Sequence, residues 1–399
     1  MIRYRSLKSS NKLGASALAL IAAIASNTSA HADDTHWQWH GVLTQGITYT
    51  SDNNFYGDSD DDASLKFTEV SLNASARLLP NLRASGQVLY RQAGAQGESG
   101  DVDYAILDYQ YLANSTAVAG IRVGRYKMPI GLYNETRDVA FTRPSIFAPQ
   151  STYPDTYRDL ELSSDGLLLY TDIFTDGGQW TIEIDGGRPR IDKDGIKTSL
   201  NFLPGEVDNI GSRNVFGGRI MYQSSDGRWV AALSRAEANI RFEHRMMPGV
   251  TTDVDTDLVY WLASLQCNIN QWTITAEYGH MDATLDSDYF VGGLHPLQYY
   301  VQVNRRFGNQ WSIYSRYDNL YWDRHDRSGD RYARLTNRDT FSNFAHDYGL
   351  GVRYDIGDNA MVSTEYHYID GAAWLSAVDN INTPVRYWSM VSMAFSYRF

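Results

Sequence analysis

The chain has 399 residues, a formal net charge of −12 at pH 7 and an aromatic content of 13%. An acidic chain is a poor ligand for nucleic acid, so we exclude a nucleic-acid-binding function. The single cysteine, Cys267, cannot form an internal disulfide bond. The histidines show no paired metal-ligand spacing, so we expect neither a metal nor another cofactor.

Residues 1–32 have the pattern of a secretory signal peptide. Basic residues lead into the apolar run Leu13–Ala25, and the small-residue sequence Ala30-His31-Ala32 follows. We therefore expect cleavage before Asp33 and export from the cytoplasm. The apolar run is too short to span a bilayer, and no later apolar run reaches the length of a membrane helix. The sequence thus predicts that residues 33–399 contain no membrane-spanning helix.

Segments of alternating polar and apolar residues, separated by turn signals, recur after the signal peptide. We interpret them as about sixteen antiparallel β-strands. The expected strands span residues 37–50, 65–79, 82–92, 102–114, 116–128, 160–175, 178–188, 214–224, 228–240, 257–268, 271–281, 298–307, 310–321, 346–356, 360–369 and 385–399. Many aromatic residues without long apolar runs suit a transmembrane β-barrel, in which one face of each strand meets lipid and the other faces water. Residues 33–399 are therefore expected to form one all-β barrel domain.

The connections between the expected strands alternate between short and long. The short connections contain Asn, Asp or Gly, which tolerate the positive φ of tight hairpins; Asp176-Gly177 and Gly308-Asn309 are examples. Short periplasmic turns and long extracellular loops are typical of outer-membrane barrels. An even number of strands also places both termini on the periplasmic side.

Alternation assigns a lipid face and a lumen face to each strand. In residues 65–79, for example, Val70 faces lipid and Glu69 faces the lumen. Three strands are partly apolar on both faces, either because another subunit replaces lipid or because a loop packs inside the barrel; these strands are 160–175, 228–240 and 257–268. Aromatic residues at strand ends predict interfacial girdles; they are Trp37, Trp39, Tyr49, Trp180, Trp229, Trp272 and Trp311.

The last expected strand has an aromatic face, which includes Phe395, Tyr397 and Phe399, and a more polar face. A soluble sheet edge of this kind would be prone to aggregation, whereas a strand that closes a barrel places the aromatic face in lipid. An edge strand of a secreted β-sandwich is the alternative. The terminal Phe399, with Tyr397 before it, resembles the C-terminal signature of bacterial outer-membrane barrels. That resemblance implies that both residues belong to the signal read by the barrel-assembly machinery.

The longest connection, residues 129–159, is the expected constriction of the channel. A barrel of about sixteen strands is wide enough for a water-filled lumen, so a selective channel needs an element that narrows it. This loop contains apolar residues such as Ile146 and Phe147 together with several prolines, which suggests that it packs against other parts of the protein. An extracellular lid or a loop that contacts another subunit is the alternative.

The segment Gly124–Tyr133, followed by Thr142-Arg143-Pro144-Ser145, resembles the region around the third loop of the phosphate-selective porin O and P family and its trimeric relatives. The signal peptide, the strand count and Phe399 also fit that family. The resemblance implies a trimeric porin with an inward-folded third loop. It does not imply phosphate selectivity, because that activity depends on a dense ladder of inward arginines and a lysine-rich entrance, whereas this chain is acidic overall.

Charged residues near the expected constriction are the candidates that control ion passage. The pore candidates are Arg122, Arg125, Lys127, Glu135, Arg137, Arg143 and Arg158. The lumen-wall candidates are Arg77, Arg83, Arg219, Arg316 and Arg353. Simple alternation puts Arg125 and Lys127 on the face opposite to Arg122, so they reach the lumen only through a bulge, for example at Gly124, or beyond the end of the strand. Inward acidic residues are nearly as numerous, so the sign of the selectivity stays open.

Together these features predict an outer-membrane porin of a Gram-negative bacterium. It would let small hydrophilic solutes diffuse passively, among them anions such as phosphate or carboxylates. Its partners would be the lipid bilayer, lipopolysaccharide and two further copies of the same chain. One alternative is a barrel-shaped enzyme, which needs a nucleophile with a positioned base; the sequence has no Gly-x-Ser-x-Gly motif. The other alternative is a structural or adhesive barrel with a plugged lumen.

Overall fold

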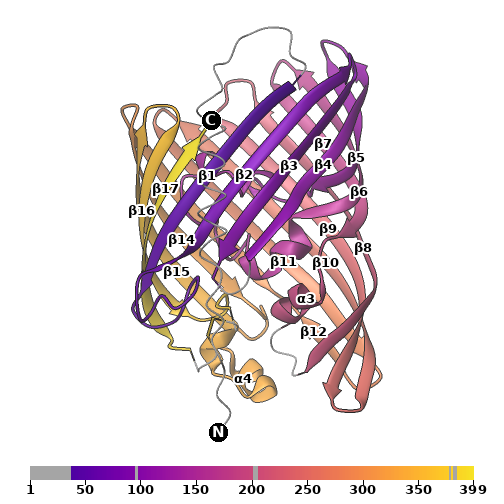
Figure 1. Cartoon of the computed structure of the whole chain (residues 1–399), viewed down its shortest axis with the longest axis vertical. Coiled ribbons are helices and arrows are strands. Elements are labelled where there is room, and N and C mark those ends of the chain that lie inside the picture. Colours follow the sequence, from indigo (N-terminus) through magenta and orange to yellow (C-terminus); the bar gives the residue numbers. More distant parts are fainter. Residues whose placement is uncertain (1–36, 95–97, 201–204, 377–378, 381–383) are drawn as a thin grey trace.

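The computed structural model of the protein describes residues 37–94, 98–200, 205–376, 379–380 and 384–399. In this part of the chain, tilted strands surround a common interior, and the connecting segments lie at the two ends of the barrel and inside it (Figure 1). The expected signal peptide, residues 1–32, lies outside the described residues.

The described secondary structure is dominated by β-strands. The strands are β1 (Trp37–Thr50), β2 (Ser64–Leu79), β3 (Leu82–Ala93), β4 (Glu98–Ala113), β5 (Ala117–Lys127), β6 (Ser163–Thr175), β7 (Gly178–Pro189), β8 (Glu206–Ser224), β9 (Trp229–Met247), β10 (Val250–Ile269), β11 (Trp272–Ser287), β12 (Val291–Leu294), β13 (Leu297–Phe307), β14 (Trp311–Tyr321), β15 (Phe344–Ile356), β16 (Ala360–Gly371) and β17 (Tyr387–Arg398). The α-helices are α2 (Arg158–Glu161), α3 (Lys193–Ser199) and α4 (Asp330–Thr336), and the 3-10 helices are η1 (Asn134–Thr136), η2 (Ala140–Thr142), η3 (Asp155–Tyr157) and η4 (Thr340–Asn343). Among the described helices, none has the length and apolar composition needed to cross a membrane.

The sheet closes on itself, because β1 pairs with β2 on one side and with β17 on the other. All neighbouring barrel strands are antiparallel, and β11 pairs directly with β13. The short strand β12 pairs only with residues 283–286 of β11, inside the connection between β11 and β13. The described residues therefore form a closed sixteen-strand antiparallel barrel with β12 as an extra strand in a loop. This confirms the predicted fold class.

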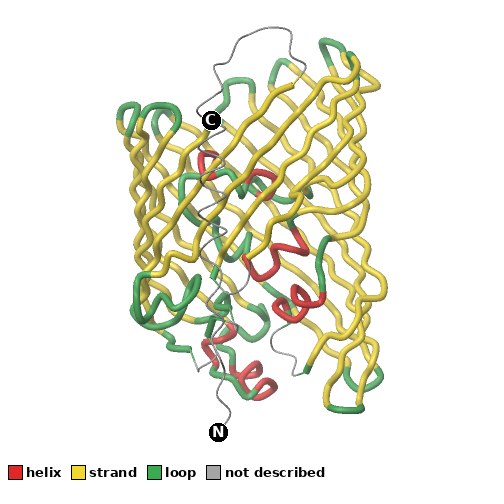
Figure 2. Tube along the Cα trace, in the orientation of Figure 1, coloured by secondary structure: helices red, strands yellow, loops and turns green. Residues whose placement is uncertain are grey.

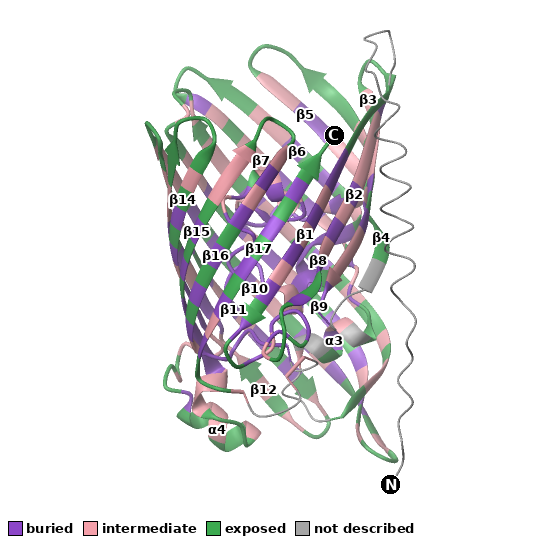
Figure 3. Cartoon of the chain, turned by 60° about the vertical axis from the view of Figure 1, so that its left-hand side comes forward, coloured by how far each residue is buried: buried purple, intermediate pink, exposed green. Residues whose placement is uncertain are grey.

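The outer and inner faces of the strands differ as the alternation predicts. On β17, Val391 and Phe395 are 46% and 43% exposed, whereas Ser392 and Ser396 are each 1% exposed. The outward residues form an apolar band that would meet lipid. The inward residues are buried and include Trp388 and Met390 as well as the two serines; Figure 3 shows the alternation of exposed and buried positions. At the closing seam, the ring of Phe399 covers Gly41 of β1, where a Cβ atom would lie 2.2 Å from the Phe399 Cζ.

The expectation of a long loop over residues 241–256 is wrong. The strands β9 and β10 continue through most of this stretch and join at a tight turn, Pro248–Gly249. The polarity of their faces reverses along this extension. Phe242 and Val254 are buried against the interior, whereas Arg241 and Asp255 form an exposed ion pair on the outer side, with Nε and Oδ1 2.6 Å apart. Where β9 and β10 extend beyond the membrane, their outer side faces water and their inner side faces packed protein. The order of polar and apolar residues in this extension is therefore the reverse of that in a lipid-facing strand.

Segments packed inside the barrel explain why three predicted strands are partly apolar on both faces. The apolar interior cluster joins Leu168 of β6, Ile240 of β9 and Leu262 of β10 with Leu160 of α2 and Ile196 of α3. Segments from the connections therefore pack inside the barrel against these strands. The sequence left two explanations open, contact with another subunit and a loop packed inside the barrel. The packed loop accounts for the apolar inner faces of these strands.

The junction between β5 and the following loop is fixed by Gly124, which has a φ of 121°. A Cβ atom at Gly124 would lie 2.3 Å from the carbonyl oxygen of Ala105 on the neighbouring strand β4. Gly124 is nevertheless paired in register with Ile106, and the register shift between β4 and β5 lies between Gln110 and Leu112. The bulge considered at Gly124 is therefore not present, and the glycine serves a close backbone approach instead.

We predict that Gly124→Ala lowers the free energy of unfolding by roughly 1–3 kcal/mol, because alanine would be strained at this φ and would clash with Ala105. The temperature at which the folded barrel converts to the slowly migrating unfolded band on a gel measures this effect. Gly177→Ala is the matched control, because the nearest atom to its Cβ, the Tyr222 hydroxyl oxygen, lies 3.6 Å away. Equal transition temperatures for the two variants would contradict the prediction.

Candidate functional site

Residues 128–162, which connect β5 to β6 and are called loop 3 below, fold into the interior of the barrel (Figure 2). The segment contains η1, η2, η3 and α2, and most of its residues are buried. Its contacts reach inward-facing side chains on opposite sides of the barrel, Glu69 on β2 and Glu277 on β11. Loop 3 therefore crosses the lumen and narrows it.

The first anchor of loop 3 is Glu277 on β11, which is 2% exposed. Its carboxylate accepts hydrogen bonds from the backbone N–H of Leu132 at 3.1 Å and from the Tyr153 hydroxyl at 2.7 Å, both in loop 3. The wall residues Ser264 and Tyr300 donate to the same carboxylate at 2.5 and 2.7 Å. One buried carboxylate thus satisfies a loop backbone donor and three hydroxyl donors, and these hydrogen bonds offset part of the cost of burying it.

A second anchor lies on β8. The Arg219 guanidinium donates to the carbonyl oxygen of Gly131 at 2.8 Å and pairs with Glu135 of loop 3 at 2.5 Å. It also pairs with Glu183 of β7 at 2.7 Å. The backbone N–H of Gly131 donates to the Ser234 hydroxyl on β9 at 3.0 Å. The start of loop 3 is therefore held through both its backbone donor and its backbone acceptor.

A third anchor holds the far part of loop 3 against β14 and β16. The Arg316 guanidinium donates to the carbonyl oxygen of Phe147 at 3.0 Å. The backbone N–H of Ser151 donates to Asp318 at 3.3 Å, and the backbone N–H of Ile146 donates to Glu365. Wall arginines and acids thus act as partners for loop backbone groups that water no longer reaches.

The root of loop 3 carries a dense set of buried ion pairs. Lys127 contacts Asp103 of β4 and Asp138 of loop 3, each with 2.7 Å between Nζ and Oδ2. Arg158 also pairs with Asp138. Burial by itself raises the pKa of Asp138, but the charges of Arg158 and Lys127 outweigh burial and hold that pKa well below its ordinary value. Asp138 is therefore ionised and ties the two ends of the loop to β4 and β5.

A neighbouring set of ion pairs joins loop 3 to β2 and β3. Arg91 pairs with Glu69 at 3.0 Å and with Asp155 at 2.9 Å, while Arg143 also pairs with Glu69, at 3.4 Å. Arg137 reaches the same Asp155 at 3.4 Å. Burial raises the pKa of Asp155, but Arg91 and Arg137 lower it more strongly, to about 2. A cavity of about 20 Å³ remains among these groups, roughly the space of one water molecule.

The first extracellular loop packs against loop 3 through aromatic rings. The Tyr56 ring stacks on Phe67 of β2 with centroids 5.2 Å apart, and Phe147 of loop 3 meets Tyr56 edge-on at 5.3 Å. Phe55 and Trp374 complete this group, with ring centroids 6.0 Å apart. The tip of loop 3 is therefore supported from the extracellular side by residues before β2 and after β16.

Arg125 and Lys127, which simple alternation places on the outer face of β5, have different surroundings in the structure. Lys127 is the last residue of β5, and its ammonium group turns inward to Asp138. Arg125 lies in phase with the exposed outer residue Val123 and pairs with the half-exposed Asp165 at 2.8 Å. We therefore leave Arg125 out of the lumen site, whereas Arg122 faces inward and pairs with Asp108 at 3.3 Å.

The remaining candidates fall into two groups by their partners. Those that hold loop 3 directly are Glu135, Arg137, Arg143, Arg158, Arg219 and Arg316. Those on the inner wall toward the periplasmic strand ends are Arg77, Arg83, Arg122 and Arg353. Sequence reasoning assigned no role to Tyr153, Tyr300 or Ser264, because a hydroxyl that donates to a carboxylate on another strand leaves no local signal.

The periplasmic half of the inner wall has more arginines than acids among the described residues. Arg353 and Arg306 share Asp355, at 2.7 and 3.4 Å. The guanidinium of Arg353 lies 5.7 Å from the ring centroid of Phe141 in loop 3, and that of Arg398 lies 4.6 Å from the same centroid. The cations are therefore placed directly next to the periplasmic side of loop 3.

A closed antiparallel barrel with an apolar outer band, a polar inner wall and a loop folded into its lumen defines the class of outer-membrane pore proteins. A sequence profile described as "Gram-negative porin" matches residues 17–373. The chain therefore belongs to the Gram-negative porin family and is an outer-membrane protein. The membership confirms the predicted porin resemblance at the level of porins in general.

Solved structures of outer-membrane proteins share this fold at low sequence identity. The trimer form of OmpT from Vibrio cholerae is 14% identical, with a TM-score of 0.56, over 92% of this chain and 100% of that one. An anion-selective porin from Comamonas acidovorans is 13% identical, with a TM-score of 0.54, over 92% and 100% of the two chains. The channel DcaP of Acinetobacter baumannii is 11% identical, with a TM-score of 0.56, over 91% and 97%. A comparison with curated protein sequences gives no significant match.

We predict that Glu277→Ala increases the open-channel current and its noise, because the variant removes the acceptor shared by Leu132, Tyr153, Ser264 and Tyr300. Single-channel recording in planar bilayers measures this effect, and heat-modifiable gel migration checks that the barrel is folded. Glu237→Ala is the control, since Glu237 pairs with Arg235 near the outer surface of β9. A Glu277→Ala channel with the current and noise of the wild type would show that loop 3 does not depend on this anchor.

Proposed function

We propose that the protein is a passive diffusion channel for small hydrophilic solutes and that it favours anions, among them carboxylates and phosphate. The observation that carries the proposal is the set of inward arginines between loop 3 and the periplasmic strand ends. The arginines are Arg77, Arg83, Arg122, Arg306, Arg353 and Arg398, and the inward acids of the same region are Asp108, Asp172 and Asp355. The proposal assigns a channel, whose action needs no catalytic residue.

The position of these charges matters more than the overall charge of the chain. Charges that line a narrow passage with low-dielectric walls concentrate ions of opposite sign, whereas charges on exposed loops are screened within about 8 Å at physiological salt. The aspartates of the first loop, such as Asp58 and Asp61, are exposed. An acidic protein can therefore favour anions when its passage is basic. The fold shared with the anion-selective Comamonas porin supports the same direction.

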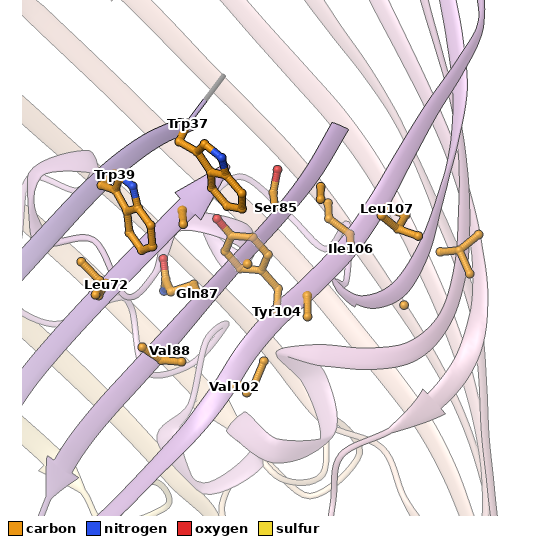
Figure 4. A pocket seen from close by; sticks show the side chains of 16 residues that line it. Trp37, Trp39, Leu72, Ser85, Gln87, Val88, Val102, Tyr104, Ile106 and Leu107 are labelled. Atoms are coloured by element: carbon orange, nitrogen blue, oxygen red, sulfur yellow. The ribbon is translucent and has the colours of Figure 1, made fainter. Parts of the chain in front are cut away.

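We also propose that three copies assemble through the outer face of β1 to β5. A shallow groove of about 720 Å³ runs over this face, and its lining includes the small residues Ala74, Ala84 and Gly86. The rings of Trp37 and Trp39 lie side by side in the same lining (Figure 4). Exposed apolar patches of this kind mark contact sites for proteins or membranes, and the small residues leave room for side chains of a neighbouring barrel.

Two further features favour a protein neighbour on this side of the barrel. The outer ion pairs of Arg125 with Asp165 and Asp101 lie beside the groove and would be costly against lipid. On the other side of the barrel, successive tyrosine rings follow β11, β13, β14 and β15 as an interfacial girdle; they are Tyr278, Tyr299, Tyr317 and Tyr348. The trimer form of the Vibrio protein with the same fold supports a threefold assembly.

A structural barrel with a closed lumen is the second candidate function. The observation that favours it is the burial of loop 3, in which Met128, Tyr153 and Asn134 are each 2% exposed or less. Conductance separates the two candidates, because a closed barrel inserts into a bilayer without producing current steps.

We predict that the wild-type protein produces current steps whose reversal potential in a salt gradient shows a preference for chloride over potassium. Replacing Arg353 and Arg398 together by Gln should shift that potential toward cation preference, because both lie next to loop 3 on its periplasmic side. Arg241→Gln is the control, since Arg241 lies on the outer side of β9. A cation preference in the wild type, or an unchanged potential in the double variant, would refute the proposed anion filter.

We predict a mass of three copies for the detergent-solubilised protein, measured by light scattering. Replacing Ala74 and Ala84 together by Trp should yield single barrels, because two large rings would fill the groove that receives the neighbouring copy. Leu350→Trp on the lipid face of β15 should leave the trimer intact. A monomeric wild type, or a trimeric double variant, would rule out this interface.

A further inference from the structure

Two arginines face each other directly on the inner wall near the periplasmic end of the barrel. Arg77 of β2 and Arg83 of β3 are cross-strand partners, and both side chains are exposed to the lumen. They lie just before and after the turn Pro80-Asn81. Like charges in directly opposed positions destabilise a hairpin unless a neighbour of opposite charge compensates them.

The neighbouring acid on the same row does not supply that compensation. Asp108 of β4 lies opposite Arg83 in the register and opposite Arg122 of β5 on its other side. Its carboxylate is held by Arg122 at 3.3 Å and by the Tyr170 hydroxyl at 2.8 Å. Within the described residues, no carboxylate oxygen lies within 4.0 Å of the guanidinium nitrogens of Arg77 or Arg83. The row Arg77–Arg83–Asp108–Arg122 therefore has an excess of positive charge.

The next positions on the same inner face add neutral hydrogen-bonding groups. Ser75 and Ser85 are cross-strand partners one step further into the lumen, and both are half-buried. They share the inner face with the two arginines, and a hydroxyl can donate a hydrogen bond to an anion. The pair of planar guanidinium groups and the pair of hydroxyls together match an oxyanion, which accepts several hydrogen bonds at once.

We propose that Arg77 and Arg83 form an oxyanion subsite at the periplasmic mouth, which binds the carboxylate or phosphate group of a solute on its way through the channel. This inference rests on the proposed function as an anion-favouring channel and names the chemical group that the mouth recognises. The subsite lies on the β2–β3 hairpin rather than on loop 3, so a solute meets it as a step separate from the constriction.

The first test uses inorganic phosphate as the probe in planar bilayers. In symmetric potassium chloride, phosphate added to the periplasmic side should reduce the wild-type chloride current reversibly and with saturation. Replacing Arg77 and Arg83 together by Gln should raise the half-blocking phosphate concentration roughly tenfold or more, since charge-assisted hydrogen bonds to the anion are lost. The Lys–Lys double variant should fall between the two, because lysine keeps the charge but not the planar fork.

Arg228→Gln is the matched control, because Arg228 lies in a periplasmic turn and pairs there with Asp226. This variant should keep the wild-type block by phosphate. A wild-type block that the Gln–Gln variant retains unchanged would overturn the subsite. Absence of any phosphate block in a conducting wild-type channel would overturn it as well.

A second measurement keeps the inference separate from the proposed function. The line width of the phosphorus resonance of inorganic phosphate, recorded with folded protein in detergent, reports weak binding without any current. The wild type should broaden the line, and the Gln–Gln variant should not; equal broadening would reject the subsite. If the wild type prefers cations in bilayers but still broadens the line through Arg77 and Arg83, the anion filter fails and the subsite stands.

Discussion

The structure depends on one constraint: a loop that fills the inside of a barrel must satisfy its backbone groups without water. Strands of the wall satisfy their own N–H and C=O groups in the ladders, but loop 3 has only short helical turns of its own. The inward side chains of the wall supply the missing partners. Glu277, Glu365 and Asp318 accept from loop N–H groups, and Arg219 and Arg316 donate to loop carbonyls. Charges that a simple pore would present to solute are thereby used to position the loop.

This use of charge divides the inner wall into two zones with different roles. At the level of loop 3, arginines and acids are buried and paired, so their fields largely cancel at a distance. On the periplasmic side of loop 3, arginines exceed the acids, and four of them are exposed: Arg77, Arg83, Arg306 and Arg398. A count of lumen charges along the whole barrel cannot separate these zones, because it treats Arg316, which is 2% exposed, like Arg77, which is open to the lumen.

The barrel itself was predictable from the sequence because period-two alternation and turn residues are local signals. The strand bounds agree closely where lipid lies outside and the lumen inside, as in β1 and β14. The prediction failed over residues 241–256, where the outer side carries ion pairs such as Arg241–Asp255 and the inner side is apolar. The position of the Lys127 side chain could not be predicted either. Its ammonium group points inward because it pairs with Asp103 and Asp138, and alternation along β5 gives no information about these partners.

The anchoring of loop 3 also has a consequence for the order of events during folding. The loop follows β5, yet its backbone is held by residues as distant as Glu365 on β16, 219 positions from Ile146. A nascent barrel that lacks its last strands therefore contains a loop whose polar backbone has only part of its partners. Docking of the loop and pairing of β17 with β1 then become one cooperative event. The contacts between residues that are distant in the sequence form together, late in folding.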